Sequence, residues 1–386
     1  MDILEGRYQL LLYDHNLDRL AVVNNYESLT YTVSLNGVDY HGWGSYEWKA
    51  YTAKMGCDPL ETDIIVAVRR RPPTGAWRTE QEYFHRKHGY SVGSNGQELY
   101  TSGGFDLRHL LRRRKCIPPA GKPYWSDYDH ATDIMNQLVI DQCTNPVDPA
   151  RRLPFLITEG DIHYGGVIGT LAIPYNQPAT KFVAESVEEL SDAAESDWDV
   201  IRSDQQFIFK AYGGRIGTDR RVGNPYGNVP VTFSITMGNV GNVEVMNDRS
   251  QEVTAVYVYG DGVGVDRPVV TRLSPYNAQG ASPWNRIEEV LEESSQQGSA
   301  NLIMAGDVFL WGNAQKKEFN FEAIPSVNCL YGVHWGLGDI MTAYYRGIPY
   351  DIRAIEVTVV IDSSGEKITP TMKVMNNATQ PDHIHP

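Results

Sequence analysis

The stretch that decides the fold is YGVHWGLGDIMTAYYRGIPYDIRAIEVTVVIDSSGEKITPTMKV, residues 331–374. Leu337–Ile340 predicts a tight turn before a strand, and Ser363–Gly365 predicts the closure of a hairpin. Between these turns, apolar side chains recur at the two-residue period of a strand that packs on one face. They are Ile355, Val357, Val359 and Ile361. Because the run holds no catalytic constellation, it indicates a β architecture.

Composition favours a large, β-rich and acidic protein. The 386 residues suit two to four domains and are enough to bury about three quarters of the unfolded surface. The 23 Tyr and 8 Trp favour half-buried strand faces and interfaces, where a ring packs and its polar end stays wet. A net charge of −14 argues against nucleic-acid binding through a general basic surface, since such binding needs cations that displace phosphate counterions.

The four cysteines are too widely spaced for a zinc knuckle or a dense disulfide framework. We expect Cys57, Cys116, Cys143 and Cys329 to be free thiols made in a reducing cytoplasm. The N-terminal MDILEGRYQL lacks the charged and apolar regions of a signal peptide. No stretch approaches the roughly eighteen apolar residues of a membrane span, so we expect a soluble protein.

The first domain is predicted to be β-rich, over residues 1–115. Apolar runs at residues 7–13 and 20–23 predict strands, and Asn36-Gly37 is a strong hairpin turn. A strand over residues 62–68 is followed by Arg69–Pro73, which the two prolines predict to be a loop. Residues 104–114 read as a helix, with the cations Arg112–Lys115 at its C-terminal end.

Residues 116–205 are predicted to form an α+β domain. A first helix has Asp129 as its cap and a stripe of apolar residues along one face: Ala131, Ile134, Met135, Leu138 and Val139. In a second helix, Ser186 and Glu189 form a capping box before a strand at residues 207–211.

A second β domain is predicted over residues 206–282 and 315–386. Strands are expected at residues 231–236, 243–246 and 253–259. A helical insertion is predicted over residues 283–314, with Pro283 at its first position and Ile287, Val290 and Leu291 on one face. The fold class is therefore mainly β with α+β parts.

Several segments occur in an order that resembles the tail-tip hub family of long-tailed bacteriophages, over nearly the whole chain. They are GFDLRHLLRRRKCIP (104–118), ATDIMNQLVIDQC (131–143), SVEELSDAAESDWDV (186–200), FIFKAYGGRIGTDRR (207–221), VYVYGDGVGVDR (256–267) and LGDIMT (337–342). The resemblance implies two β domains similar to the tail-tube subunit, with smaller mixed α/β domains outside them. Three chains would then supply six tube-like domains, so that a homotrimer docks on a hexameric tube ring.

The implied function is that of a structural virion protein at the distal end of the tail tube, assembled in the host cytoplasm. Implied partners are the tail tube or distal tail ring, tip or fibre proteins and the tape measure protein, with DNA passing without specific binding. Larger relatives carry a C-terminal extension for receptor binding or peptidoglycan cleavage. Here the chain stops about where the hub ends, at His383–Pro386, so no such activity is expected.

Two other functions stay open on sequence grounds. One is a tail-tip hydrolase of the cell wall, for which any pair among 48 acidic residues could serve. The other is a carbohydrate-binding adhesin that uses Trp43, Trp48 and Trp77. Because no GxSxG, HExxH or cysteine-protease signature is present, we predict no enzyme, no catalytic residue, no metal and no cofactor.

Two motifs could be taken for binding sites. Gly260, Gly262 and Gly264 follow a strand but lack the Lys-Ser/Thr and the helix of a nucleotide loop, so a structural loop is predicted. An acidic cluster could ligate calcium, but without a glycine-turn loop it is interpreted as a solvated helix end. Its residues are Asp192, Glu195, Asp197 and Asp199.

Histidines and basic runs are also interpreted as surface features. His85 and His88, with Glu82, have a spacing that could ligate a metal on a helix, but a surface loop is favoured. His383 and His385 are assigned to a disordered terminus. The runs Arg69–Arg71 and Arg112–Lys115 could contact DNA or an acidic ring, and solvated charge is the favoured interpretation. In a channel, we expect them to lie outside the bore or at a contact between rings.

Overall fold

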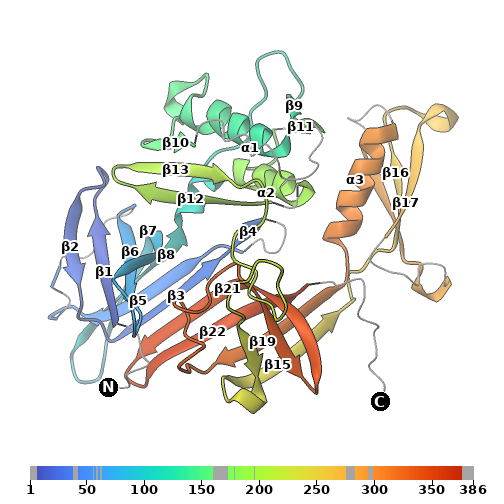
Figure 1. The fold of residues 1–386 in the computed structure, drawn as a ribbon. Coiled ribbons are helices and arrows are strands. Elements are labelled where there is room, and N and C mark those ends of the chain that lie inside the picture. The colour runs from blue at the N-terminus through green and yellow to red at the C-terminus, as the bar shows by residue number, and fades with distance from the viewer. Residues whose placement is uncertain are drawn as a thin grey trace.

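The computed structural model describes residues 7–37, 42–54, 56–57, 60, 63–159, 173–177, 179–194, 196–274, 283–293 and 299–375. Its dominant feature is a thirteen-stranded sheet at the base of the molecule (Figure 1). The mainly β class predicted from the sequence is confirmed.

The large sheet is built from both ends of the chain. N-terminal strands are β1 (Arg7–Tyr13), β2 (Arg19–Val23), β3 (Ser28–Ser34), β5 (Ser45–Tyr51), β6 (Ile65–Arg71), β7 (Arg78–Val92) and β8 (Glu98–Asp106). C-terminal strands are β14 (Thr232–Ser234), β15 (Val240–Asp248), β19 (Lys316–Ala323), β20 (Ile340–Tyr345), β21 (Ile348–Asp362) and β22 (Gly365–Val374). The order β15-β19-β22-β21-β3-β5-β8-β7-β6-β1-β2 leaves β15 and β2 as its two edges.

The seam between the two sets of strands is the pairing of β21 with β3, from Glu356↔Ser34 to Ile361↔Leu29. The predicted alternation along β21 is confirmed, because Ile355, Val357 and Val359 are buried in the core. The predicted hairpin is confirmed too, since β21 and β22 pair up to Asp362↔Gly365. One apolar core, with residues from both sets of strands, therefore lies against this sheet.

A smaller α+β layer lies over the sheet in Figure 1. Its four-stranded sheet has the order β10 (Leu156–Thr158), β13 (Gln206–Ala211), β12 (Asp197–Ser203) and β4 (Asn36–Gly37). Strands β9 (Trp125–Asp129) and β11 (Ile173–Gln177) form a separate pair. The helices are α1 (Ala131–Val139), its π-helical continuation η2 (Ile140–Thr144), the 3₁₀ turn η3 (Pro149–Arg151) and α2 (Val183–Ala193). The predicted apolar stripe of α1 is confirmed, since all five residues are buried.

The predicted helix starts in this layer are wrong. Helix α1 has His130 at its N-cap, and Asp129 accepts a hydrogen bond from the adjacent His130 N–H, outside the helix. Helix α2 begins at Val183, and Glu185 Oε2 accepts from Phe182 N–H at 2.8 Å. The Ser186–Glu189 pair therefore lies inside the helix, where Ser186 is buried and donates to the Phe182 carbonyl.

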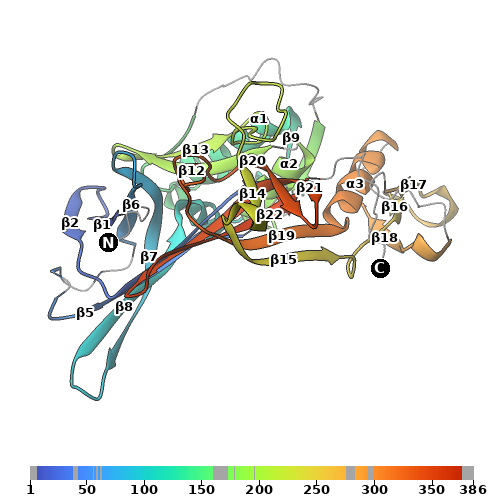
Figure 2. The same cartoon turned by 60° about the horizontal axis from the view of Figure 1, so that its bottom comes forward.

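A third unit stands to one side in both views of the fold (Figures 1 and 2). It contains β16 (Ala255–Tyr259), β17 (Val269–Leu273), β18 (Glu288–Glu292), the 3₁₀ turns η5 (Gly264–Asp266) and η6 (Pro283–Asn285), and α3 (Ser299–Gly312). The helix predicted from Pro283 through Leu291 is wrong, because β18 pairs in parallel with β16. Leu291 packs on the core beneath α3 while Val290 is exposed, which is the alternation of a strand.

Two local predictions near the first domain also need correction. Arg69–Arg71 belong to strand β6, because pairing with β1 continues to Arg7↔Arg71 and the chain leaves the sheet only at Pro72. Residues 104–114 are not one helix. Strand β8 runs to Asp106, and a 3₁₀ helix η1 (Leu107–Arg113) follows, capped by Asp106 Oδ1.

Two predictions about the chain as a whole can be compared with this fold. The cysteines are free thiols as predicted, and burial raises the pKa of Cys143 to about 12. In the part of the chain that the structure describes, no helix is long and apolar enough to span a bilayer. The domain boundaries at residues 115, 205, 282 and 314 stay a prediction.

Candidate assembly interface

A long segment without regular structure, residues 212–231, connects β13 to β14, and we call it the crossing loop. The first half of the crossing loop is held in place by Asp339, which lies in the turn before β20. Asp339 Oδ1 accepts from Thr218 N–H at 2.7 Å, and Oδ2 accepts from Arg220 Nε at 3.1 Å and from Gly336 N–H at 3.0 Å. The predicted turn at Leu337–Ile340 is confirmed, and its carboxylate also fixes a segment more than a hundred residues away.

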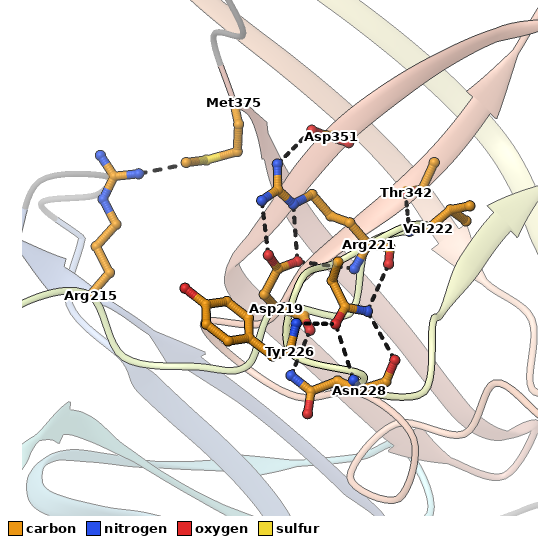
Figure 3. A network of polar contacts seen from close by, with 10 residues as sticks. Arg215, Asp219, Arg221, Val222, Tyr226, Asn228, Thr342, Asp351 and Met375 are labelled. Carbon is orange, nitrogen blue, oxygen red and sulfur yellow. Dashed lines mark hydrogen bonds and ion pairs between the residues drawn. The ribbon is translucent and has the colours of Figure 1, made fainter.

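The middle of the crossing loop is tied to the sheet by Arg221 (Figure 3). Its guanidinium donates from Nε and Nη2 to both oxygens of Asp219, at 3.0 and 2.8 Å, and from Nη1 to Asp351 Oδ2 on β21 at 2.9 Å. These donated hydrogen bonds lower the pKa of the Asp219 carboxyl. Val222 N–H donates to Thr342 Oγ1 at 3.1 Å, which adds a contact to β20.

The tip of the loop is closed by Asn224. Its Nδ2 donates to the carbonyls of Arg221 and Asn228 at 3.0 and 2.9 Å, and its Oδ1 accepts from Tyr226 N–H and Asn228 N–H at 3.2 and 3.0 Å. One side chain therefore satisfies four backbone groups across a short turn. The turn holds Tyr226 on a fixed backbone, with 75% of the residue exposed.

Apolar side chains are exposed along the loop and just after it. Val222 is 54% and Val229 is 72% exposed, and Ile235 and Met237 are exposed in the 3₁₀ turn η4 (Ile235–Met237). Val245 and Met246 continue this exposure on the edge strand β15. Large apolar side chains held on ordered backbone beside a sheet edge are typical of protein interfaces.

Buried ion pairs connect segments that are far apart in the sequence, within the large sheet and between it and the α+β layer. Arg70 on β6 pairs with Glu366 on β22 at 2.8 Å, and Arg353 on β21 pairs with Asp197 on β12 at 2.5 Å. Arg108, beside its partner Asp106, donates to the Ser34 carbonyl at 2.7 Å. All of these side chains are almost completely buried, so they connect segments far apart in sequence without contact with solvent.

The two basic runs are only in part the solvated charge that the sequence suggested, because Arg71 and Arg112 are exposed while the other cations are buried or half-buried. Arg70 is buried, and Arg71 donates to the Gly75 carbonyl. In the second run, Arg113 pairs with Asp63 at 2.9 Å, Lys115 donates to the Thr180 carbonyl, and Arg114 donates to the Arg151 carbonyl. Arg112 lies over the rings of Trp43 and Phe182. Each run has partners within the chain.

The structure also corrects the surface-loop interpretation of His85 and the interpretation of the acidic cluster as a solvated helix end. His85 lies in strand β7, not in a surface loop, and its Nδ1 hydrogen-bonds Ser102 Oγ at 2.9 Å. Burial lowers the pKa of His85 to about 4. The acidic cluster is not a solvated helix end, because Asp197 is fully buried in β12. Among the described residues, no group of three metal-ligating side chains is found.

The structure also shows where the candidate sugar-binding tryptophan and the glycine motif lie. Trp48 is completely buried in the core, so it cannot serve as an exposed sugar-binding residue. Gly260, Gly262 and Gly264 lie in the connection between the antiparallel strands β16 and β17, as the structural-loop prediction requires. Glu195, His383 and His385 lie outside the described residues. The interface signal missed from the sequence was the glycine-rich crossing loop itself.

Helix α2 carries two carboxyls that predict a pH dependence of stability. Burial raises the pKa of Glu188 to about 7, and burial together with the Glu188 charge raises that of Asp192 to about 8. Folded-state pKa values above the unfolded ones mean that the folded protein binds more protons, so stability falls as pH rises from about 4, where the unfolded carboxyls ionise, to about 8, and it levels off above the folded-state values. We expect a loss of about 2 kcal/mol in unfolding free energy between pH 6 and pH 9.

Urea unfolding at several pH values measures this effect. Asp192→Asn and Glu188→Gln should each flatten the dependence, while Asp204→Asn, at an exposed site, should leave it unchanged. A wild-type stability that rises between pH 6 and pH 9 would contradict the assignment.

Comparisons with known proteins agree with this architecture. The sequence matches the Siphovirus ReqiPepy6 Gp37-like protein family over residues 9–372. A search of curated proteins finds no match.

Three solved structures share the fold at low sequence identity. A tail protein from Neisseria meningitidis MC58 has a TM-score of 0.59 at 11% identity, with 96% of this chain and 97% of that chain covered. The 43 kDa tail protein of prophage MuSo2 from Shewanella oneidensis has a TM-score of 0.58 at 10% identity, with 94% and 98% covered. The prophage tail protein gp18 from Listeria monocytogenes EGD-e has a TM-score of 0.51 at 12% identity, with 96% and 95% covered.

The family match extends from β1 to β22 and so includes both edges of the large sheet, the crossing loop and the third unit. The structural matches cover nearly the full length of three phage or prophage tail proteins, which confirms the resemblance drawn from the order of segments. The chain therefore has the fold of phage tail proteins and belongs to the Siphovirus ReqiPepy6 Gp37-like protein family.

Proposed function

We propose that this chain is a non-enzymatic structural subunit of a siphovirus tail, which forms a homotrimeric hub at the distal end of the tail tube. The hub adapts the six-fold tube to three-fold tip proteins and forms part of the DNA-ejection channel. Its neighbours are the tube or distal tail ring, tip or fibre proteins and the tape measure protein.

One observation carries the proposal. The N-terminal and C-terminal strands lie side by side in one sheet, joined at the β21–β3 seam and open at β2 and β15. Two sheet halves in one chain give three chains six such halves, the number a hexameric ring requires. Edge strands present unpaired N–H and C=O groups that a neighbouring subunit can cover. The exposed apolar residues beside β15 lie where this contact would form.

Trimer formation is the first expected result. Multi-angle light scattering of the purified chain at micromolar concentration should report three times the monomer mass. A stable dimer would contradict the hub, because two chains supply only four sheet halves.

The edge strand β15 should control this assembly. Met246→Lys adds a desolvated charge to the proposed contact, so we expect a trimer dissociation constant about tenfold higher or more. The monomer should keep its stability, because Met246 is exposed. Val263→Lys, on the β16–β17 connection, is the matched control and should assemble normally. Equal assembly of both variants would exclude β15 from the interface.

The arginine contacts support a channel that does not hold DNA. Arg69–Arg71 and Arg112–Lys115 have partners within the chain, so these cations are not free to line a bore and retain phosphate. We expect only weak binding of duplex DNA by the purified trimer in a filter assay at physiological salt. Tight, salt-sensitive binding would contradict this part of the proposal.

A further inference from the structure

Two basic segments of the chain lie against each other. They are Arg112–Lys115, at the end of η1, and Arg151–Arg152, at the end of η3. Arg112 and Arg113 each have a carboxylate within ion-pair distance, Glu185 at 3.9 Å and Asp63 at 2.9 Å. Within the part of the chain that the structure describes, the other cations of the two segments form no ion pair: Arg114, Lys115, Arg151 and Arg152.

Reciprocal arginine contacts hold the two segments together. Arg114 Nε donates to the Arg151 carbonyl, and Arg151 Nη2 donates to the Lys115 carbonyl. Arg151 Nη1 also donates to Oε1 of the buried Gln142, at 3.1 Å. Burial raises the pKa of the Cys143 thiol and the charges of Arg114 and Arg151 oppose that rise, so both guanidiniums lie near it. The fold therefore places these two cations side by side.

These contacts fix the arginines without cancelling their charge. A carbonyl or amide oxygen accepts a hydrogen bond but carries no formal charge, and Arg114 and Arg151 each keep further N–H donors. Asp148, the carboxylate nearest to Arg151 in sequence, instead accepts from Ala150 N–H at 3.0 Å. Both arginines are half-buried, where a charge attracts an opposite charge more strongly than it does in water.

An exposed apolar side chain lies beside these cations. Ile117 is 45% exposed, and the Gln142 amide fixes its backbone by accepting from Ile117 N–H and donating to Ile117 C=O, both at 3.0 Å. The same Gln142 oxygen accepts from Arg151, so the Ile117 backbone and the Arg151 guanidinium are neighbours. Arginine beside an apolar contact on ordered backbone is typical of the residues that dominate protein interfaces.

We infer that Arg114, Ile117, Arg151 and Arg152, which we call the arginine surface, dock an acidic segment of a neighbouring protein. Carboxylates of that segment pair with the arginines, and an apolar side chain between the carboxylates packs on Ile117. The aliphatic Ile117 favours a protein over a nucleic acid, because phosphate contacts are charged and polar. The arginine surface does not depend on the proposed trimer, since its residues all come from one chain.

The test uses the full chain and a six-residue peptide, capped at both ends, in which two leucines lie between pairs of glutamates. A comparison peptide has serines in place of the leucines. Fluorescence anisotropy should show the leucine peptide binding with a dissociation constant below about 1 mM, and about tenfold tighter than the serine peptide. The net charge of −14 on the chain repels both peptides, so their binding does not arise from general attraction.

Variants at exposed positions locate the binding. Arg152→Glu should weaken binding of the leucine peptide about tenfold, while Arg346→Glu, the same charge change on the exposed turn between β20 and β21, should not. Ile117→Ser should weaken binding of the leucine peptide about tenfold and leave binding of the serine peptide unchanged, because only leucine contacts Ile117. Since these side chains are exposed, all three variants should unfold at the urea concentration of the wild type.

Several results would overturn the arginine surface. They are no binding of the leucine peptide, equal weakening by Arg152→Glu and Arg346→Glu, an equal effect of Ile117→Ser on both peptides, and tighter binding of duplex DNA than of the leucine peptide. A smaller light-scattering mass for Arg152→Glu would also overturn it, since the surface would then bind a second copy of this chain. The mass of the wild type reports the trimer by itself, so failure of the arginine surface and failure of the hub are distinguishable.

Discussion

Replacing Gly217 by alanine should destabilise the fold by about 3 kcal/mol or more, or prevent folding altogether. The crossing loop passes the turn before β20 so closely that a Cβ atom on Gly217 would lie 2.1 Å from both the carbonyl carbon and the oxygen of Gly338. Backbone on both sides cannot move aside as a flexible side chain can. Gly217 also has a φ of +104°, which residues with a Cβ rarely adopt.

A matched substitution separates these two causes. Gly223, in the same loop, has a φ of +78° but open space where its Cβ would be. Gly223→Ala should therefore cost only the conformational term, about 1 to 2 kcal/mol. Chemical unfolding of both variants gives the comparison. If the two variants lose the same free energy, the close crossing at Gly338 has no role in stability.

The parts of the fold that the sequence could predict are those with local causes. The β21–β22 hairpin follows from a two-residue period and a turn at Asp362–Gly365, and helix α1 follows from an apolar stripe over nine residues. In both cases the pattern and the structure that it predicts lie within one short window. The same reasoning failed for β18, because its residues alternate between buried and exposed only in the folded unit. There β18 pairs with β16, and Leu291 packs on the core beneath α3.

The parts that could not be predicted depend on distant partners. Arg70 looks like one residue of a basic surface run, yet its partner Glu366 is 296 residues away. Asp197 looks like one of several acids after a helix, yet Arg353 is 156 residues away. Burial of a charge is decided by whether such a partner exists, and no local pattern reports it. The crossing loop was missed for the same reason, since Asp339 and Asp351 anchor it from the C-terminal strands.

These long-range contacts also explain why the candidate interface is on ordered backbone. A segment of this length without regular structure is commonly mobile, and ordering it on binding would oppose association. Here hydrogen bonds within the loop fix its conformation, and they involve Asp219, Arg221 and Asn224. Two further hydrogen bonds, to Asp351 and Thr342, attach the loop to strands β21 and β20 of the large sheet. The exposed Tyr226 is therefore presented before any partner arrives, which favours tight assembly.

The second large effect is expected at the buried pair of Arg353 and Asp197, which joins the large sheet to the α+β layer. Asp197→Ala should lower the free energy of unfolding by about 3 to 5 kcal/mol. Arg353 is completely buried and would keep its charge without the carboxylate that now faces it, although it also donates to the Gly338 and Ile216 carbonyls. Ile216 N–H would also lose its acceptor, since it donates to Asp197 Oδ2 at 2.7 Å. Urea unfolding of the purified variant measures the loss.

A double-mutant cycle identifies the cause. Arg353→Met removes the cation and keeps most of its volume, so the double variant Asp197→Ala/Arg353→Met should be more stable than Asp197→Ala alone, because no unpaired charge is left inside. Asp307→Ala, which breaks a half-exposed pair with Arg272 in the third unit, should change stability by less than about 1 kcal/mol. If the double variant loses the sum of the two single losses, the charge of Arg353 is not what Asp197 compensates, and the pair acts only by filling space between the two layers.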